Sequence, residues 1–410
     1  MATPQLLTSA TFVDGSTGNV AIDAEGRISG VGDHDGRSVD AGGEALERID
    51  LSGHVLLRAP VEPHAHLDKA FLSEQIANPS GDLLGAIEAM RANRHLLTVD
   101  ETVERAERAA RLFASNGYVA VRTHADLTAE HGLTSIEALG EVKRRVADVI
   151  DVEIVALTGW PVTGTDGARH RDLLTEAVDR GVDLVGGCPH LEPMGGDGTI
   201  AEATEVFLQA ADDARLPVDL HTDETLDPRA NGLDLLADAV LAGFDLPVTA
   251  SHCVSLGQRG ASEQAASAER VAAAGVNVVA LPHTNLYLQG RGHHPMPRAL
   301  TAVRALREAG ANLSAGADNL QDPFNPLGRA CAFETAALML FTCHLLPHEA
   351  WATVANASAR TLGRDDHPSG DHGLTIGAPA DLLAVPAESV REAIAFGPAG
   401  RRRWRAGVET

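Results

Sequence analysis

Two histidines separated by a single residue, His64 and His66, form the first pair in the chain whose spacing suggests chemistry. They come at the end of an apolar run near residues 55–64 that we expect to be a β-strand. Because side chains alternate between faces along a strand, residues i and i+2 point the same way. Two imidazoles on one face make half of a metal site. On their own they also fit two ordinary histidines at the end of a strand.

Three further polar residues lie at the ends of apolar runs, and two of them, His221 and Asp318, are the candidates for the missing ligands. His221 and His252 each end a short apolar run, and Asp318 directly follows another. Imidazole and carboxylate together suit Zn²⁺ or Fe²⁺, whereas Ca²⁺ and Mg²⁺ prefer oxygen ligands. We therefore predict one divalent metal ion, Zn or Fe, bound by His64, His66, His221 and Asp318.

Acid–base groups lie close to these predicted ligands. Glu224 follows His221 by three residues, near enough to reach the same pocket and to carry a proton between water and a leaving group. His252 is placed to hydrogen-bond the water or a developing oxyanion. A bound metal ion lowers the pKa of water from 15.7 toward about 7, so hydroxide becomes available near neutral pH. The simpler alternatives are a solvated loop carboxylate and a structural histidine.

The elements that must position these side chains alternate along the middle of the chain. Apolar runs rich in Val, Ile and Leu are separated by stretches with helical spacing, and the runs lie near residues 55–64, 118–124, 151–157, 182–187, 217–221, 248–252, 276–281 and 311–317. Eight strands with intervening helices predict an α/β fold of the (β/α)8 TIM-barrel type, in which chemistry lies at the carboxyl ends of the strands. A doubly wound open sheet is the rival, and the lack of a Gly-rich phosphate-binding motif after the strands argues against it.

Both ends of the chain have a different pattern. Residues 1–56 read as short strands broken by Gly and Asp, and strand-like runs return near 380–385 and 402–408. We predict a small β-sandwich domain formed by both termini. Its N-terminal part is 1–56, the barrel is 57–363, and the C-terminal part is 364–410.

Composition restricts the partners. The formal net charge is −24, with 57 Asp and Glu against 33 Lys and Arg, which argues against binding nucleic acid or an anionic membrane surface. The four cysteines include no CxxC pair, and neither a targeting segment nor a transmembrane run is present, so we expect a cytoplasmic protein. The expected partner is a small heterocyclic substrate, and a homo-oligomer stays open.

The motifs around these residues resemble the amidohydrolase superfamily, and within it the cytosine deaminase group. The matching segments follow the order of that family over residues 55–385, and they are Pro63-His64-Ala65-His66-Leu67-Asp68, Arg122-Thr123-His124, Pro189-His190-Leu191-Glu192, His221-Thr222-Asp223-Glu224, Ala250-Ser251-His252, Asn285-Leu286-Tyr287-Leu288-Gln289-Gly290-Arg291 and Asp322-Pro323-Phe324-Asn325-Pro326-Leu327-Gly328. The segment that ends in Lys69 is also similar to N-alkylammelide amidohydrolases, which remove alkylamines from triazine rings.

The resemblance implies the same four metal ligands, with Glu224 as proton shuttle and His252 assisting the hydrolytic water. It also implies that Asp318 accepts a proton from that water. The run at 182–187 carries no lysine of the kind that bridges two metals in binuclear relatives, which favours one metal ion. His124 is expected to orient neighbouring strands.

Two departures from the family pattern concern the substrate. Asn319 stands where the deaminases have a second aspartate, and Gly159 stands where they have a glutamine that binds the pyrimidine edge. An aspartate only accepts hydrogen bonds, whereas an asparagine also donates them, so we expect altered substrate recognition and doubt that cytosine is accepted. The candidate substrate-binding residues are Lys69, Trp160, Gln289 and Asn319. Phe324 is a further aromatic candidate, with core packing as its alternative role.

These observations predict a mononuclear metal-dependent hydrolase. Its metal-bound hydroxide attacks a ring carbon that carries an amino or alkylamino group, on a pyrimidine, purine, pterin or triazine type of ring. Two alternatives stay open: a ring-opening hydrolase of cyclic amides, and a ligand-binding homologue without turnover.

Overall fold

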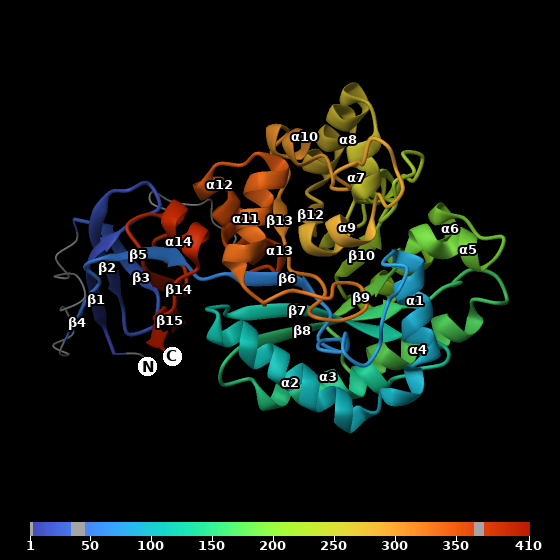
Figure 1. Cartoon of the computed structure of the whole chain (residues 1–410), viewed down its shortest axis with the longest axis horizontal. Helices are drawn as coiled ribbons and strands as arrows, with labels where there is room; N and C mark the ends of the chain where they lie inside the picture. Colours follow the sequence, from blue (N-terminus) through green and yellow to red (C-terminus); the bar gives the residue numbers. More distant parts are fainter. Residues whose placement is uncertain (1–2, 34–45, 365–372) are drawn as a thin grey trace. The chain divides into compact units, whose positions relative to one another are not determined.

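The computed structural model describes residues 3–33, 46–364 and 373–410. The chain forms two compact units. One contains Glu62–Leu112 and Val121–Ala330, and the other contains Met1–Val61, Phe113–Ala120 and Cys331–Thr410. Figure 1 shows both units, coloured along the chain.

The first unit is built on eight strands that alternate with helices (Figure 1). The strands neighbour one another in chain order, and they are β6 (Val61–Ala65), β7 (Ala120–Leu127), β8 (Asp151–Thr158), β9 (Leu184–Gly187), β10 (Val218–Thr222), β11 (Val248–His252), β12 (Asn277–Ala280) and β13 (Leu313–Ala315). The registered pairs from β8 to β13 are parallel. Nearly every residue of these strands is buried, as expected for a sheet that is covered on both faces.

The two edge strands of this sheet meet. A parallel bridge joins Ala65 to Asp318, and the Asp318 amide donates to the His64 carbonyl oxygen at 2.9 Å. The Glu62 carboxylate accepts hydrogen bonds from the amides of His64 (3.1 Å) and Ala317 (3.0 Å). These contacts close the sheet, and they confirm the predicted (β/α)8 barrel.

Helices follow the strands along the chain. The longer ones are α1 (Leu83–Ala92), α2 (Val99–Ser115), α3 (Thr134–Arg145), α4 (Ala168–Asp179), α6 (Ile200–Ala214), α7 (Gly232–Leu241) and α8 (Ala261–Ala274). Shorter helical segments follow β9, β11 and β12, and they are η3 (Pro189–Leu191), α5 (Glu192–Gly195), η4 (Val254–Gln258), α9 (Pro282–Leu288) and α10 (Val303–Glu308). A single 3-10 turn, η2 (Arg94–Leu96), joins α1 to α2.

The predicted strand at 55–64 is wrong in one respect, because the structure divides it. β5 (His54–Arg58) pairs with a C-terminal strand of the second unit, whereas β6 belongs to the barrel. Ala59 and Pro60 lie between them, and a proline has no amide hydrogen to continue a ladder.

The second unit draws its strands from both ends of the chain, as predicted. The strands are β1 (Gln5–Thr11), β2 (Thr17–Ile22), β3 (Ile28–Gly32), β4 (Glu47–Asp50), β5, β14 (Leu382–Pro386), β15 (Arg402–Arg405) and β16 (Val408–Glu409). They form one hydrogen-bonded path in the order β16-β15-β14-β5-β1-β2-β3, and β4 pairs with β1. The indole nitrogen of buried Trp404 donates to Gln5 Oε1 at 2.9 Å, which ties the last strands to the first.

Within its described residues, this second unit also contains four α-helices of its own. They are α11 (Ala332–Cys343), α12 (Pro347–Val354), α13 (Asn356–Thr361) and α14 (Val390–Phe396). Phe333 of α11 stacks on Trp351 of α12 with the ring centroids 4.8 Å apart. Burial of these two large rings anchors the helices to each other.

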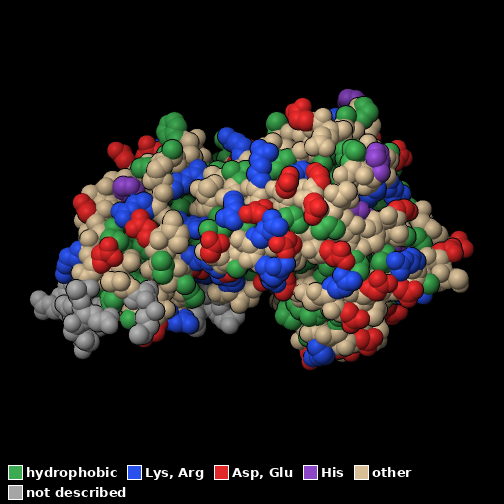
Figure 2. Space-filling model, turned by 90° about the horizontal axis from the view of Figure 1, so that it is seen from below, with side chains coloured by type: hydrophobic (Ala, Val, Ile, Leu, Met, Phe, Trp, Pro, Cys, Tyr) green, Lys and Arg blue, Asp and Glu red, His purple; other side chains and the backbone are tan. Residues whose placement is uncertain are grey.

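Acidic and basic side chains are interspersed over the molecular face in Figure 2. Among the residues that the structure describes, no helix combines the length and the apolar character needed to span a bilayer.

Candidate active site

Four side chains from three strand ends, those of β6, β10 and β13, converge inside the barrel. His66 Nε2 lies 3.2 Å from Asp318 Oδ1 and 3.3 Å from His221 Nε2, and His64 Nε2 lies 3.6 Å from Asp318 Oδ1. Ligand atoms at the corners of a tetrahedron around Zn²⁺, each 2.0–2.2 Å from the ion, are about 3.4 Å apart. These three distances are close to that spacing, whereas the two groups whose ligand atoms all lie within 4.8 Å of one another are His64 with His124 and His221, and His64 with His252 and Asp318.

Unpartnered polar atoms mark the same point. His64 Nε2 and both carboxylate oxygens of Asp318 are fully buried, and no hydrogen-bond partner for them lies within residues 3–33, 46–364 and 373–410. A buried polar atom without a partner is costly, and a bound cation removes that cost. Three imidazoles and one carboxylate suit Zn²⁺ or Fe²⁺. The residues thus fit a single divalent ion.

The protonation states also favour a cation. Burial lowers the pKa of His64 and of His221 well below the usual value, and the neighbouring histidines lower it further. Burial raises the pKa of Asp318, but its contacts with His66 and His252 outweigh this effect, so the pKa lies below the usual value. Neutral imidazoles and an ionised carboxylate are the states that bind metal.

A chain of hydrogen bonds fixes the orientation of His64. Ser251 Oγ donates to Asp219 Oδ1 at 3.0 Å, and Arg122 Nη1 donates to Asp219 Oδ2 at 3.0 Å. Since the Ser251 hydroxyl has given its hydrogen to Asp219, its oxygen accepts from His64 Nδ1 at 2.9 Å. His64 therefore carries its hydrogen on Nδ1, and Nε2 is left free to bind metal.

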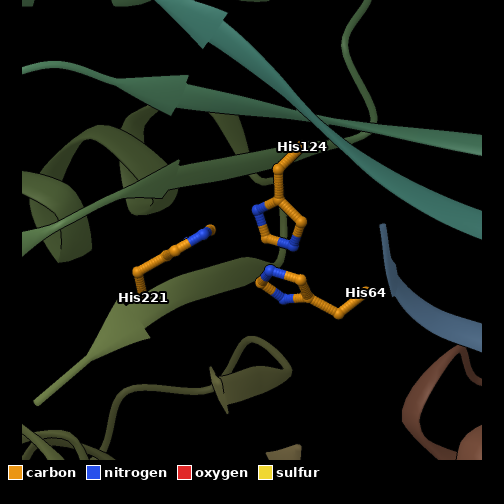
Figure 3. A group of neighbouring side chains, drawn as sticks. All are labelled: His64, His124 and His221. Carbon is orange, nitrogen blue, oxygen red and sulfur yellow. The ribbon is translucent and has the colours of Figure 1, made fainter. Parts of the chain in front are cut away.

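His124 lies closer to this centre than its expected role of orienting strands requires. Figure 3 shows the rings of His64, His124 and His221 gathered together, and His124 stacks on His64 with centroids 3.8 Å apart. One ring nitrogen from each of the three histidines lies within 4.8 Å of the others. Within the described part of the chain, neither nitrogen of His124 has a hydrogen-bond partner.

Glu224 and His252 lie side by side at the metal site and share one neighbour. Asn285 Nδ2 donates to Glu224 Oε1 at 3.1 Å and to His252 Nδ1 at 3.1 Å. Because His252 Nδ1 accepts this bond, the neutral ring carries its hydrogen on Nε2. No role for Asn285 is predicted from the sequence, although the residue begins one of the matching family segments.

The pKa values of these two groups shift in opposite directions. Burial, together with the charge of Asp318, raises the pKa of Glu224 well above its ordinary value. Burial lowers the pKa of His252 to about 4. At neutral pH His252 is therefore a neutral hydrogen-bond donor, and Glu224 takes up a proton more readily than an ordinary glutamate does.

A small cavity opens onto these groups. Its wall includes polar and charged side chains and a set of apolar ones, and the predicted site residues among them are His66, Lys69, Trp160, His221, Glu224, His252, Asp318 and Asn319. The apolar part is formed by Leu83, Ile87, Met90, Leu157, Leu191 and Phe324. Phe324 also packs against a buried cluster that contains Leu72 and Met90, so it has the core-packing role and in addition borders the cavity.

Lys69 is held by ion pairs at the wall of this cavity. Its Nζ lies 2.6 Å from Asp126 Oδ1, 3.4 Å from Asp68 Oδ1 and 3.1 Å from His66 Nδ1. Burial alone lowers the pKa of Lys69, but the two carboxylates outweigh it and the pKa is raised. Lys69 is thus a buried cation that also borders the cavity.

Trp160 and Gln289 have different positions. Trp160 lies on the cavity wall, and the guanidinium of Arg91 lies 4.9 Å above its ring. Gln289 lies in a neighbouring groove, where its Nε2 donates to the Glu224 carbonyl oxygen at 3.1 Å. Its predicted contact with a substrate edge stays a prediction.

Gly159 is confined by a neighbouring side chain. A Cβ at this position would lie 2.9 Å from His170 Nε2, which itself accepts a hydrogen bond from the Ala129 amide at 3.3 Å. The space next to Gly159 is therefore taken by His170, and a glutamine there would require His170 to move.

The chain is similar in sequence to one protein family and to named relatives. Residues 74–408 match the sequence model described as "Amidohydrolase family". A pterin deaminase of Rhizobium rhizogenes (strain K84) is 33% identical over 350 residues, which cover 83% of this chain and 77% of that protein.

Two solved structures have a similar fold. The 5-methylcytosine deaminase of Klebsiella pneumoniae, liganded with phosphonocytosine, has a TM-score of 0.85 and 29% identity, with 98% of this chain and 97% of that chain covered. The N-isopropylammelide isopropylaminohydrolase of Burkholderia multivorans has a TM-score of 0.79 and 25% identity, with 99% and 98% covered.

Proposed function

We propose that this chain, which belongs to the amidohydrolase family, deaminates an amino-substituted N-heterocycle at a single metal centre. The relatives named above are hydrolases of C–N bonds. The observation that carries the proposal is the convergence of His64, His66, His221 and Asp318 beside Glu224 and His252. The relatives named pterin deaminase and 5-methylcytosine deaminase support a flat, amino-bearing ring as substrate.

The ion would be held by His64 Nε2, His66 Nε2, His221 Nε2 and one oxygen of Asp318. When bound, Zn²⁺ or Fe²⁺ would supply a Lewis acid that lowers the pKa of water, so that the water can lose a proton near neutral pH and attack a ring carbon. The chain's own residues account for the other requirements of the reaction.

Glu224 is proposed to carry the proton. Its raised pKa lets it take a proton from the attacking water and give that proton to the departing amine. Asn285 holds the Glu224 carboxylate in place, and the backbone of Glu224 is fixed by Gln289. These fixed contacts keep the shuttle close to both the water and the leaving group.

His252 is proposed to act as a hydrogen-bond donor. Since Asn285 occupies its Nδ1, the Nε2 hydrogen is available to the oxygen that forms on the attacked carbon. The low pKa of His252 keeps the ring neutral, so it donates without becoming a proton source. Asp318 is proposed to accept the first proton of the water in addition to binding metal.

The cavity suits one small flat ring. Trp160 and Phe324 offer aromatic faces, and Leu157 and Met90 exclude water from the ring. Lys69 and Asn319 are proposed to contact its polar edge. The crowding of Gly159 by His170 leaves no glutamine to bind a pyrimidine edge, so we expect cytosine to be a poor substrate.

The test is Glu224→Gln, which removes the proton carrier and keeps the shape of the side chain. We expect metal content to be unchanged by elemental analysis and ammonia release from pterin to fall by a factor of about 10² to 10⁴. Pterin is the first probe, and a panel of aminopyrimidines, aminopurines and aminotriazines follows.

The matched control is Glu308→Gln, at an exposed glutamate of α10, which should leave turnover unchanged. Near-normal turnover in Glu224→Gln would rule out the shuttle. Ring-opened products without ammonia would instead favour the hydrolase of cyclic amides.

A further inference from the structure

The side-chain amide of Asn319 has a fixed orientation. Its Nδ2 lies 2.7 Å from Asp322 Oδ2, and both side chains are buried. An ionised carboxylate only accepts hydrogen bonds, so the atom that faces it must be the donating nitrogen. The carbonyl oxygen of Asn319 therefore points away from Asp322, and it accepts a hydrogen bond from Thr284 Oγ1 at 3.4 Å on one of its two lone pairs.

Asp322 cannot easily turn, because its other oxygen is also occupied. Oδ1 accepts from the amides of Phe324 at 2.8 Å and Asn325 at 3.2 Å. Asn325 Nδ2 in turn donates to the backbone carbonyl oxygen of Asn319 at 3.0 Å. Burial raises the pKa of Asp322 to about 6, and the carboxylate is therefore mostly ionised at pH 7 to 8.

Asn319 and Thr284 both border the cavity that contains Glu224 and His252, and Asn319 directly follows the metal ligand Asp318. Asn319 is thus one of the residues that a ring placed beside Asp318 would meet. Thr284 occupies one lone pair of the Asn319 oxygen, and the second lone pair stays unpaired in a dry cavity unless the ligand brings a donor to it.

We propose that Asp322 makes Asn319 an obligate hydrogen-bond acceptor, and that the enzyme thereby selects rings with an N–H group at the edge beside the reacting carbon. The preferred class is an amino-substituted lactam, in which the ring nitrogen between the amino-bearing carbon and an oxo-bearing carbon carries hydrogen. This inference rests on the proposed function, and it explains how an asparagine serves where the family has an aspartate.

The geometry specifies a variant that reverses the selection. In Asp322→Asn the new carbonyl oxygen stays with the two backbone amides of Phe324 and Asn325, so the new NH₂ group faces Asn319. Asn319 must then turn its oxygen toward residue 322, which directs its own NH₂ group into the cavity. The double variant Asn319→Asp with Asp322→Asn restores an acceptor at 319, because the carboxylate accepts from the amide at 322.

The probes are pterin and its 4-methoxy analogue, 2-amino-4-methoxypteridine. In pterin the nitrogen between the two substituted carbons carries hydrogen, whereas in the methoxy compound the same nitrogen is an acceptor. We would measure kcat/KM for ammonia release and dissociation constants by calorimetry at pH 7.5, on metal-loaded proteins. The wild type should prefer pterin by about 10- to 100-fold, a ratio typical of one unpaired buried polar group.

Asp322→Asn should lose this preference or reverse it, and the double variant should regain it. Since the methoxy group has the same bulk in all three proteins, a steric effect would not change between them. An unchanged preference in Asp322→Asn, or equal losses on both probes, would overturn the proposal. If Asp322→Asn fails to fold, the double variant decides: loss of the pterin preference in a folded double variant also overturns it.

The two proposals fail in different ways. If none of the proteins releases ammonia from any ring, the proposed function fails, and the dissociation constants of the two probes still test the acceptor at Asn319. If ammonia is released with no dependence on the ring N–H, the proposed function stands and the inference about Asn319 is wrong.

Discussion

At the scale of single residues, Asp126 is held between two cations from different elements. Its Oδ1 lies 2.6 Å from Lys69 Nζ, and its Oδ2 lies 2.8 Å from Arg94 Nη2. Burial raises the pKa of Asp126, but the charges of Lys69 and Arg94 outweigh burial and hold the pKa far below its usual range. Removing one partner of a buried ion pair leaves uncompensated charge.

We therefore expect Asp126→Asn to lower the free energy of unfolding of the metal-free protein by about 3 kcal/mol at pH 7. A carboxylate with a lowered pKa stabilises the fold above its pKa in the unfolded chain, about 3.9, and loses this contribution as the pH falls further. The difference between wild type and variant should thus stay constant from pH 7 to about pH 5 and narrow only below about pH 4. Urea denaturation at a series of pH values measures it.

The control for this variant is Asp227→Asn. Asp227 pairs with Arg229 on the surface, where an ion pair contributes little, so Asp227→Asn should change the free energy of unfolding far less than Asp126→Asn does. If the difference in the free energy of unfolding between wild type and Asp126→Asn disappears already between pH 7 and pH 5, the pKa of Asp126 is not lowered.

The chain sequence indicates some of the site residues and hides others. His64, His66, His221 and Asp318 are visible because each ends or follows an apolar run. Asn285 cannot be identified in this way, because it is distinguished only by its contact with Glu224, which is 61 residues away in the chain. The partners of a polar side chain depend on the closed barrel, and local spacing does not contain that information.

At the scale of elements, the strand positions could be predicted well and two helices could not. α4 begins at Ala168 after the N-cap Gly167, which has no side chain to cap it, so its start carries no recognisable signal. The last helix before the apolar run at 311–317, α10, begins only at Val303, since Ala299 has a φ of 54°, which an α-helix cannot contain. Caps and backbone reversals of this kind decide where helices begin, and apolar spacing does not report them.

Closure of the barrel depends on one carboxylate. Glu62 of β6 accepts hydrogen bonds from the backbone amides of His64 and of Ala317, which follows β13. A Cβ on Gly316 would lie 2.6 Å from Glu62 Oε1, so a glycine there leaves room for this contact. The same contacts place His64 and Asp318 opposite each other across the joint.

Glu62→Ala should therefore lower both stability and metal occupancy. Leaving the two buried amides without an acceptor costs about 2–4 kcal/mol in the free energy of unfolding. Urea denaturation and elemental analysis of the purified variant measure the two effects. Glu62→Gln is the matched control, since its carbonyl oxygen can still accept, and it should lose less of both. Normal metal content and stability in Glu62→Ala would contradict this account of closure.

At the scale of the whole molecule, the chain ends and the middle form separate compact units. The sequence indicates the shared terminal sheet, because strand-like runs occur only at the two ends outside the alternating middle. It does not indicate that residues 331–363 group with the terminal segments and not with the barrel, because helical spacing does not tell which neighbours a helix packs against.

The amount of apolar core in the two units determines how the protein responds to removal of the metal ion. Small metal domains unfold without their ion because they have little core of their own. In this chain the buried apolar residues run through every barrel strand and through the terminal sheet, and His64 and His221 are buried as neutral rings. The fold therefore has a large source of stability that does not involve the ion.

We expect the chelated protein to keep its far-UV circular dichroism and to lose its activity. The ion binds the folded chain only, so it stabilises by mass action, by about 4 kcal/mol when free metal is at 1,000 times its dissociation constant. For a chain of this size, that corresponds to a rise of several degrees in melting temperature. Reloading with Zn²⁺, or with Fe²⁺ without oxygen, should restore activity with about one ion per chain. Loss of secondary structure on chelation would make the ion a structural one, and unchanged activity would remove it from the reaction.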